Sequence, residues 1–204
     1  MKRVLAVTAL LLMVASVAMA AETATKKGDL DIWVGAGYST ILSPNIPSGA
    51  PSIKGSLGAL VGVYYMVMPA VGVGVMSGYL IAEKQTIADV SGSDSLKFTG
   101  SIIPITAQGI YVIPAKGVKP YVGVGLGIYM IHSKAEDVAA GVSASDNTSK
   151  FGFNVGAGFS VPAGEKMSVG VDAKLHLVKD TDVADDGTPK MGKFLTAVAA
   201  VHFK

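Results

Sequence analysis

The sequence has 204 residues, of which 50% are hydrophobic and 16% charged, and this length suits one domain. After residue 20 it has no Arg, and 15 Lys balance 15 Asp and Glu, which argues against a nucleic-acid-binding surface. The absence of Cys excludes disulfide bonds, a thiolate metal site and a Cys nucleophile.

The first 20 residues have the pattern of a secretory signal peptide. Lys2 and Arg3 precede an apolar run, and Ala18-Met19-Ala20 provides the small residues of a cleavage site. An N-terminal membrane anchor is the alternative, but the apolar run is short for a span of about 20 residues. We therefore expect a signal peptide over 1–20 and a short N-terminal segment over 21–28.

Residues 55–82 form a second uncharged stretch, long enough for a membrane-spanning helix. However, the stretch contains six Gly as well as Pro69, and both residue types are poor in a helix interior. Residues 71–75 alternate between Val and Gly with the period of a strand. Two strands joined by a turn near 67–70 fit this texture better than one helix.

The same alternation recurs along the chain and predicts eight strands. We place them near 29–40, 53–66, 70–83, 96–112, 119–132, 150–161, 166–178 and 193–203. Tight turns near 67–69, 113–118 and 162–165 alternate with longer polar connections near 41–52, 84–95, 133–149 and 179–192. This arrangement predicts an all-β fold, an eight-stranded antiparallel up-and-down transmembrane β-barrel over 29–204, with both ends on the periplasmic side. Pro104 interrupts the fourth strand, where we expect a β-bulge.

The two faces of the strands indicate which side meets lipid. In the fifth strand, aliphatic residues alternate with Gly123, Gly125 and Gly127. A secreted soluble barrel that binds a hydrophobic ligand would expose this glycine face to water, where glycine contributes little. With the aliphatic face toward lipid, the glycines instead leave room for large side chains in a narrow interior. We expect these side chains to be Trp33, Tyr64, Tyr121 and Tyr129.

Aromatic residues on the lipid-facing phase gather at the two ends of the strands. Tyr38, Tyr79, Phe151 and Phe153 lie near the long connections, and Tyr65, Tyr111, Phe159 and Phe203 lie near the tight turns. Two aromatic girdles of this kind are typical of transmembrane barrels, because the rings anchor at both membrane interfaces.

Three sequence features carry a resemblance to a known family: Ile103-Pro104-Ile105-Thr106, Tyr111, and the segment Lys119–Tyr129 with its Lys-Pro-Tyr-x-Gly-x-Gly-x-Gly pattern. They resemble the outer-membrane protein β-barrel domain family, which groups with the opacity-type and outer membrane protein A-like eight-stranded barrels. The last strand resembles the family's terminal signal, since an alternating strand closes on Phe203, although Lys204 follows.

The resemblance implies a location in the cell outer membrane, in contact with its lipid and lipopolysaccharide. It also implies that periplasmic chaperones and the barrel-assembly machinery handle the chain, with Phe203 as the residue recognised for assembly. We expect a monomer that needs no cofactor.

The nearest approach to a catalytic group is His132-Ser133 with Glu136. Outer-membrane enzymes that modify lipid A place such groups on a barrel wall, so a hydrolase is an alternative. However, adjacent strand residues point to opposite faces, so His132 and Ser133 diverge unless the strand has ended. We interpret all three as solvated loop residues and expect no catalytic residue.

Other charged residues fall into two groups. The acidic segment Asp180–Asp186 could attract divalent cations, but Ala184 and Asp185 depart from the pattern of a calcium-binding loop. Asp172 and Lys174, together with Asp31 and Lys54, lie on interior phases, where we expect pairing or hydration. Pairing of the first and last strands should also bring Asp31 near His202, since an unpaired strand edge is not stable in lipid.

These features predict a small non-enzymatic outer-membrane barrel with an envelope-structural, surface-loop or weak porin-like role. The alternatives are a lipid A-modifying enzyme and a secreted soluble barrel. The sequence leaves both possibilities for passage of small solutes through the interior. Charged side chains would block it, whereas the many glycines could leave a narrow path of water.

Overall fold

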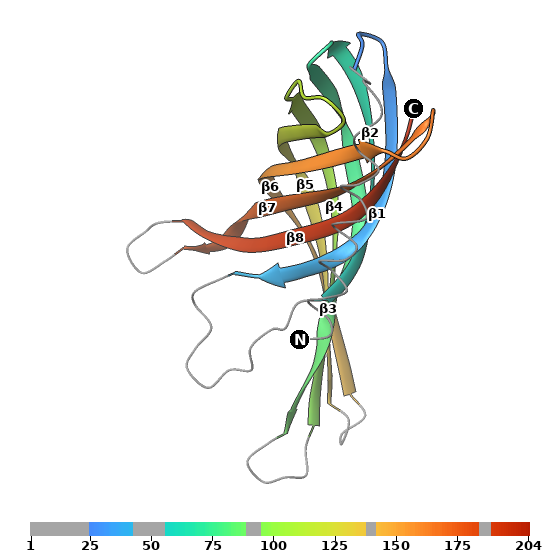
Figure 1. Ribbon diagram of the computed structural model, residues 1–204. Coiled ribbons are helices and arrows are strands. Elements are labelled where there is room, and N and C mark those ends of the chain that lie inside the picture. The colour runs from blue at the N-terminus through green and yellow to red at the C-terminus, as the bar shows by residue number, and fades with distance from the viewer. Residues whose placement is uncertain (1–24, 43–55, 89–94, 138–141, 184–188) are drawn as a thin grey trace.

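The computed structural model describes residues 25–42, 56–88, 95–137, 142–183 and 189–204 (Figure 1). Within them lie the strands β1 (Leu30–Ile41), β2 (Ser56–Met68), β3 (Val71–Ala88), β4 (Ser95–Val112), β5 (Lys119–Asp137), β6 (Val142–Pro162), β7 (Met167–Val183) and β8 (Pro189–Phe203). They form a closed barrel in chain order, in which every neighbouring pair is antiparallel. This confirms the predicted fold class. The expected signal peptide and Lys54 lie outside the described residues.

The stagger of the barrel follows from its register. From Leu30, the paired positions lead through Tyr65, Val73, Gly109, Val124, Val155, Leu175 and Leu195 back to Thr40 on β1. One circuit therefore advances the register by ten residues (40 − 30 = 10). Such a shear tilts the strands by about 35–45° and, with eight strands, leaves an interior that side chains can fill.

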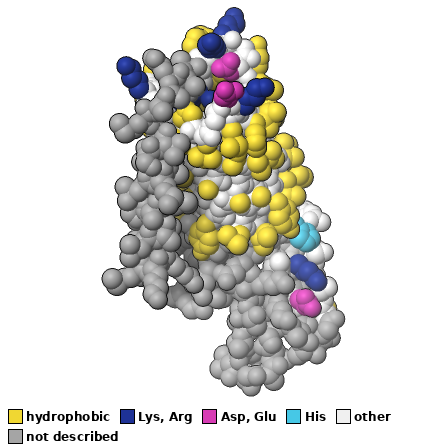
Figure 2. Space-filling model, turned by 45° about the vertical axis from the view of Figure 1, so that its right-hand side comes forward, with side chains coloured by type: hydrophobic (Ala, Val, Ile, Leu, Met, Phe, Trp, Pro, Cys, Tyr) yellow, Lys and Arg dark blue, Asp and Glu magenta, His cyan; other side chains and the backbone are white. Residues whose placement is uncertain are grey.

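The aliphatic side chains face outward. Val124, Leu126 and Val75 are 60%, 57% and 60% exposed, and Figure 2 shows a hydrophobic belt between charged side chains at its upper and lower ends. The interior holds Trp33 and Tyr64 instead, each only 2% exposed. This is the orientation that the sequence predicts for a barrel in lipid.

The uncharged stretch considered above as a helix forms β2 and β3, joined by a turn at Pro69-Ala70. No helix in the described part of the chain is long and apolar enough to cross a membrane.

The tight turns gather at one end of the barrel, in the upper part of Figure 1, together with the end of β8. Gly117, between β4 and β5, has a φ of 73°, a left-handed conformation that favours glycine. Gly28, with a φ of 94°, allows the chain to turn into β1, and its N–H donates to the carbonyl of Met66 at 2.8 Å. Residues 25–29 therefore dock on the end of β2.

At the opposite end, five strands continue at least four residues further than their sequence predicts. β3 and β5 extend to Ala88 and Asp137, whereas the alternation places their ends near 83 and 132. β6 begins at Val142, eight residues before its expected start at 150 (150 − 142 = 8). β7 continues to Val183 and β8 begins at Pro189, beyond their predicted bounds near 178 and 193. The predicted long connections after β3, β5 and β7 are therefore partly wrong, because their outer residues pair as strands.

The outer parts of β3, β4, β5 and β6 form a sheet that leaves the barrel, which we call the β3–β6 extension. It comprises residues 82–88, 95–101, 132–137 and 142–150. The pairing of β6 with β7 ends at Gly152 and Val178, although β6 stays paired with β5 as far as Val142. In Figure 1 the extension points downward, whereas β1 and the β7–β8 hairpin point to the left.

The bulge expected at Pro104 is absent from the described pairings of β4. Pro104 pairs with Tyr129 in an unbroken register with β5. On the β3 side, pairing is interrupted between Ile105 and Ile102 but resumes in the same register. Proline cannot donate a ladder hydrogen bond, and here the lost bond does not require an extra residue. The register between β3 and β4 shifts instead between Ala82 and Gln85.

Candidate functional site

The barrel interior contains two sets of interacting polar and aromatic side chains, one above the other. The short-turn layer consists of Asp31, Trp33, Tyr64, Tyr121, Asp172, Lys174 and His202. The long-loop layer consists of Tyr129, Asn154, His176, Phe194 and Thr196. Because strands alternate, each of these side chains comes from the inward phase of its strand.

A buried ion pair lies at the centre of the short-turn layer. The Lys174 ammonium is 2.6 Å and 2.5 Å from the two carboxylate oxygens of Asp172, and these residues are only 3% and 2% exposed. The Tyr121 hydroxyl, on β5, donates to Asp172 on β7 at 2.8 Å, across the intervening strand β6. Lys174 also lies 5.5 Å from the centre of the Trp33 ring, within the range of a cation–π contact. These contacts offset the cost of removing two charges from water.

A second pair links the first and last strands. His202 Nδ1 is 3.1 Å from both carboxylate oxygens of Asp31, and the cross-strand pairing of β1 with β8 places them together. Trp33 stacks between His202 and Tyr64, with ring centres 6.2 Å and 6.3 Å apart. The structure thus brings Asp31 and Asp172 into one layer, each with a cationic or ionisable partner.

The long-loop layer is a chain of neutral hydrogen bonds. The Asn154 amide donates to the Tyr129 hydroxyl at 3.4 Å, which leaves the hydroxyl proton for His176 Nδ1, 3.0 Å away. His176 Nε2–H can then donate to the Thr196 hydroxyl at 3.1 Å. The Thr196 hydroxyl itself donates to the Lys174 carbonyl at 3.5 Å. One tautomer of a neutral histidine satisfies every bond, because an amide nitrogen can only donate.

Packing closes the space around both layers. Phe194 stacks on His176 with ring centres 4.4 Å apart, and Leu60, Met76, Leu80 and Val178 are buried beside it. The rings of His176 and His202 both pack against aromatic neighbours.

Four interior glycines, Gly62, Gly74, Gly152 and Gly158, lie beneath aromatic rings. Trp33 is paired with Gly62, Tyr64 with Gly74 and Tyr121 with Gly158. A Cβ at Gly62 would lie 2.4 Å from the Trp33 indole nitrogen, and one at Gly158 would lie 2.4 Å from the Tyr121 hydroxyl. The rings therefore occupy the track that the glycines could have left for water.

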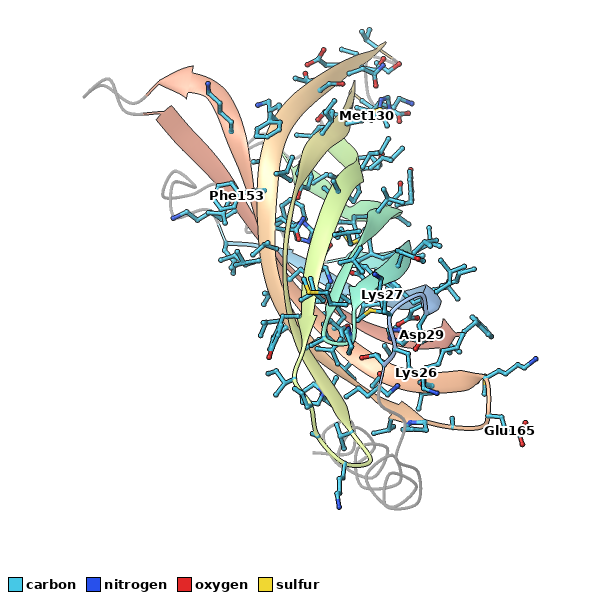
Figure 3. The ribbon with its side chains drawn as sticks, turned by 90° about the horizontal axis from the view of Figure 1, so that it is seen from above. Lys26, Lys27, Asp29, Met130, Phe153 and Glu165 are labelled. Atoms are coloured by element: carbon cyan, nitrogen blue, oxygen red, sulfur yellow. The ribbon has the colours of Figure 1, made fainter. Side chains whose placement is uncertain are left out.

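The predicted girdle residues all carry outward-facing side chains. Tyr38, Tyr79 and Phe153 are exposed toward the long-connection end, and Figure 3 shows Phe153 pointing away from the barrel wall. Tyr65, Tyr111 and Phe203 are exposed toward the tight turns, and Phe159 is partly exposed. Figure 3 also shows Lys26, Lys27 and Asp29 together at the tight-turn end, beyond which Glu165 marks the β6–β7 turn.

The residues considered for catalysis lie in β5 and not in a loop. His132 Nδ1 is 2.6 Å from the side-chain oxygen of Asn147, whereas Glu136 pairs with Lys134 at 3.6 Å. Ser133 follows His132 within a continuous strand, so the two side chains point to opposite faces. Their geometry does not form a catalytic group.

The acidic segment Asp180–Asp186 begins within β7 and is only partly described, since Asp185 and Asp186 fall outside the described residues. Among the residues that are described, no group of three or more His, Asp or Glu could hold a metal ion.

The sequence matches the family described as outer membrane protein beta-barrel domain over residues 7–203. The chain belongs to this family. It is therefore a small transmembrane β-barrel of the bacterial outer membrane, in a family of non-enzymatic barrels. No curated protein matches the chain.

Solved structures of similar barrels come from several bacteria. Neisserial surface protein A (NspA) is 15% identical with a TM-score of 0.57, and the match covers 86% of this chain and 96% of that one. Ail, the attachment invasion locus protein of Yersinia pestis, is 17% identical with a TM-score of 0.51, covering 87% and 98%. A major outer membrane protein of Thermus thermophilus is 13% identical with a TM-score of 0.53, covering 86% and 100%. These likenesses show the shared fold.

Proposed function

We propose that this protein is a closed, non-conducting outer-membrane barrel whose β3–β6 extension serves as a contact surface outside the cell. The observation that carries the proposal is the filled interior. Two layers of polar and aromatic side chains cross the barrel, and the glycines that could have left a water path lie beneath Trp33, Tyr64 and Tyr121. A weak porin-like role is therefore the less favoured of the envelope roles.

The β3–β6 extension supports the surface role. Its β5–β6 part exposes His132, Ser133, Lys134 and Glu136 on one strand and residues 142–147 on the other. Hydroxyl, amide and charged groups dominate, and they stand on paired strands. A rigid polar sheet holds such groups in place for recognition better than a loop does. Attachment, which the name of Ail describes for that protein, is a role of this kind.

The closed interior is tested by single-channel recording of the refolded chain in planar bilayers. We expect no stable conductance steps from the unsubstituted protein. The matched control is the triple variant Trp33→Ala, Tyr121→Ala and Tyr129→Ala, which removes two rings from the short-turn layer and one from the long-loop layer and should admit ions. Regular conductance steps from the unsubstituted chain would overturn the non-conducting part of the proposal.

The surface role is tested by removing the β5–β6 part of the extension. Replacing residues 134–145 by Asn-Gly joins Ser133 to Asp146, which are already paired, through a turn that favours hairpins. Cells that carry the shortened barrel should adhere less to protein-coated and cell-coated surfaces, while the folded amount, read from heat-modifiable gel migration, stays unchanged. Equal adhesion at equal folded amounts would contradict the surface role.

Assembly of the barrel is proposed to depend on Phe203. This residue ends β8 and is 45% exposed, so its ring is accessible on the lipid side. Phe203→Ala should lower the folded amount in the outer membrane several-fold, whereas the neighbouring Lys204→Ala should leave it near the unsubstituted level. Quantified gel shifts of outer-membrane fractions give the comparison, and equal amounts for both variants would exclude the terminal signal.

A further inference from the structure

A pocket opens at the tight-turn end of the interior, between the short-turn layer and that end of the barrel. Its lining includes six polar residues from four strands and the chain end: Tyr64, Lys119, Tyr121, Ser168, His202 and Lys204. Outer-membrane barrels carry their short turns on the periplasmic side, so this pocket faces the periplasm.

Three buried polar atoms in this pocket have no hydrogen-bond partner among the described residues. They are the Tyr64 hydroxyl, the Ser168 hydroxyl and Nε2 of His202, and the three residues are 2%, 1% and 3% exposed. Buried polar groups are nearly always hydrogen-bonded, and each one left unpaired costs free energy. Their gathering around one pocket indicates a polar partner that enters it.

The pocket's acceptors are engaged, whereas its donors are open. Both carboxylate oxygens of Asp31 face His202 Nδ1, and Asp29 accepts from the Lys26 backbone N–H at 2.8 Å. The two hydroxyls and the second nitrogen of His202 remain available to a ligand.

Lysine side chains add positive charge at the same mouth. The half-buried Lys119 interacts electrostatically with Lys204 as well as with Asp29 and Asp31. A ligand with one negative charge would reduce the repulsion between the two ammonium groups. Its repulsion by the carboxylates of Asp29 and Asp31 would be weaker than that of a multivalent anion. A metal cation would find its best oxygen ligands already taken.

We propose that this pocket binds the carboxylate group of a small periplasmic solute or of a peptide end. The Tyr64 and Ser168 hydroxyls donate to its oxygens, and the ammonium groups of Lys119 and Lys204 attract its charge. This site is independent of the proposed surface role, because it lies at the other end of the barrel.

Trp33 provides the readout, since it is the one Trp of the sequence and its ring stacks on His202. The refolded full chain in phospholipid vesicles is titrated with sodium acetate, with sodium chloride at equal ionic strength as the control. Acetate should change the Trp33 fluorescence in a saturable way, and chloride should not. A parallel titration with the dipeptide Ala-Ala and with its C-terminal amide distinguishes a peptide end from a free small carboxylate.

Ser168→Ala and Tyr64→Phe are the decisive variants, because each removes only a hydroxyl that has no partner among the described residues and should leave folding unchanged. Each should weaken acetate binding by about tenfold, the effect of losing one hydrogen bond to a charged group. Lys134→Gln, on the β3–β6 extension, is the matched control and should bind like the unsubstituted chain. No saturable response, or equal affinities in all variants, would overturn the proposal and leave water as the partner of these atoms. Either result leaves the conductance and adhesion tests unaffected.

Discussion

The two layers of the interior solve the same packing problem with different chemistry. In the short-turn layer, Asp172 and Lys174 form a buried ion pair and Asp31 contacts His202. Four polar atoms in or beside this layer have no partner among the described residues: the Trp33 indole nitrogen, the Tyr64 and Ser168 hydroxyls and His202 Nε2. In the long-loop layer, a neutral chain runs from Asn154 to Thr196 among apolar neighbours, and Asn154 Oδ1 is its one unpartnered atom in the part of the chain that the structure describes.

The difference shows that filling a barrel and satisfying its polar groups are separate requirements. Both layers place aromatic rings over glycines, so both exclude water by shape. The short-turn layer keeps more hydrogen-bonding capacity beyond its own contacts than the long-loop layer, where only Asn154 Oδ1 lacks a partner among the described residues. The long-loop layer therefore closes the barrel, whereas the short-turn layer also forms the inner wall of the pocket at the tight-turn end.

The largest loss of stability is expected when one charge is removed from the short-turn layer, which tests whether that layer depends on its ion pair. Asp172→Ala leaves the buried Lys174 ammonium without its partner and should lower the free energy of unfolding by about 3–5 kcal/mol. Urea unfolding in phospholipid vesicles, followed by Trp33 fluorescence, measures the change. The double variant Asp172→Leu with Lys174→Met should be close to the unsubstituted protein, since it removes both charges together. An unchanged stability of Asp172→Ala would show that the charge pair is not essential to the layer.

A second test asks whether the two layers are packed equally tightly. A Cβ at Gly158 would lie 2.6 Å from the Val171 carbonyl, and one at Gly152 would lie 2.6 Å from the Leu177 carbonyl. Gly158→Ala and Gly152→Ala should each destabilise by about 1–3 kcal/mol in the same unfolding assay. Gly109→Ala is the control, because a Cβ there would have no heavy atom within 4 Å. A large difference between the two interior sites would mean that packing, as well as polarity, separates the layers.

The smallest effects on stability are expected from removing one hydroxyl from each layer, which compares a hydroxyl with partners to one without. Tyr129→Phe takes a partner from both His176 and Asn154, so it should destabilise by about 1–3 kcal/mol. Tyr64→Phe removes a hydroxyl without a partner among the described residues and should change the stability by less than about 0.5 kcal/mol. The same unfolding curves test both, and equal losses would contradict the assignment of spare capacity to the short-turn layer.

The fold could be predicted from the sequence wherever the two faces of a strand meet different environments. Between lipid and interior, aliphatic residues alternate with glycine, and β1 begins and ends within one residue of its predicted range 29–40. In the β3–β6 extension the exposed β5–β6 residues meet water on both faces, so Ser, Thr and Lys show no alternation. Residues 142–149 consequently read as a connection, although they pair with β5.

Short-range contacts of the interior could also be predicted, but contacts across it could not. Asp172 and Lys174 share a face at a spacing of two residues, and the closure of β1 on β8 brings Asp31 to His202. The bond from Tyr121 to Asp172 joins β5 to β7, which are not neighbours in the sheet. Such contacts depend on the stagger of the whole barrel, which no single strand encodes.

The pairing of Ile32 with Phe203 has a consequence for chain order. Because the first and last strands are neighbours like any other pair, a circularly permuted chain should reach the same barrel when its old ends are linked and new ends are cut in a long connection. Refolding in detergent would then succeed, yet Phe203 would no longer close the chain. The permuted chain would then fold like the original chain but would lack the terminal residue proposed to direct its assembly into the membrane.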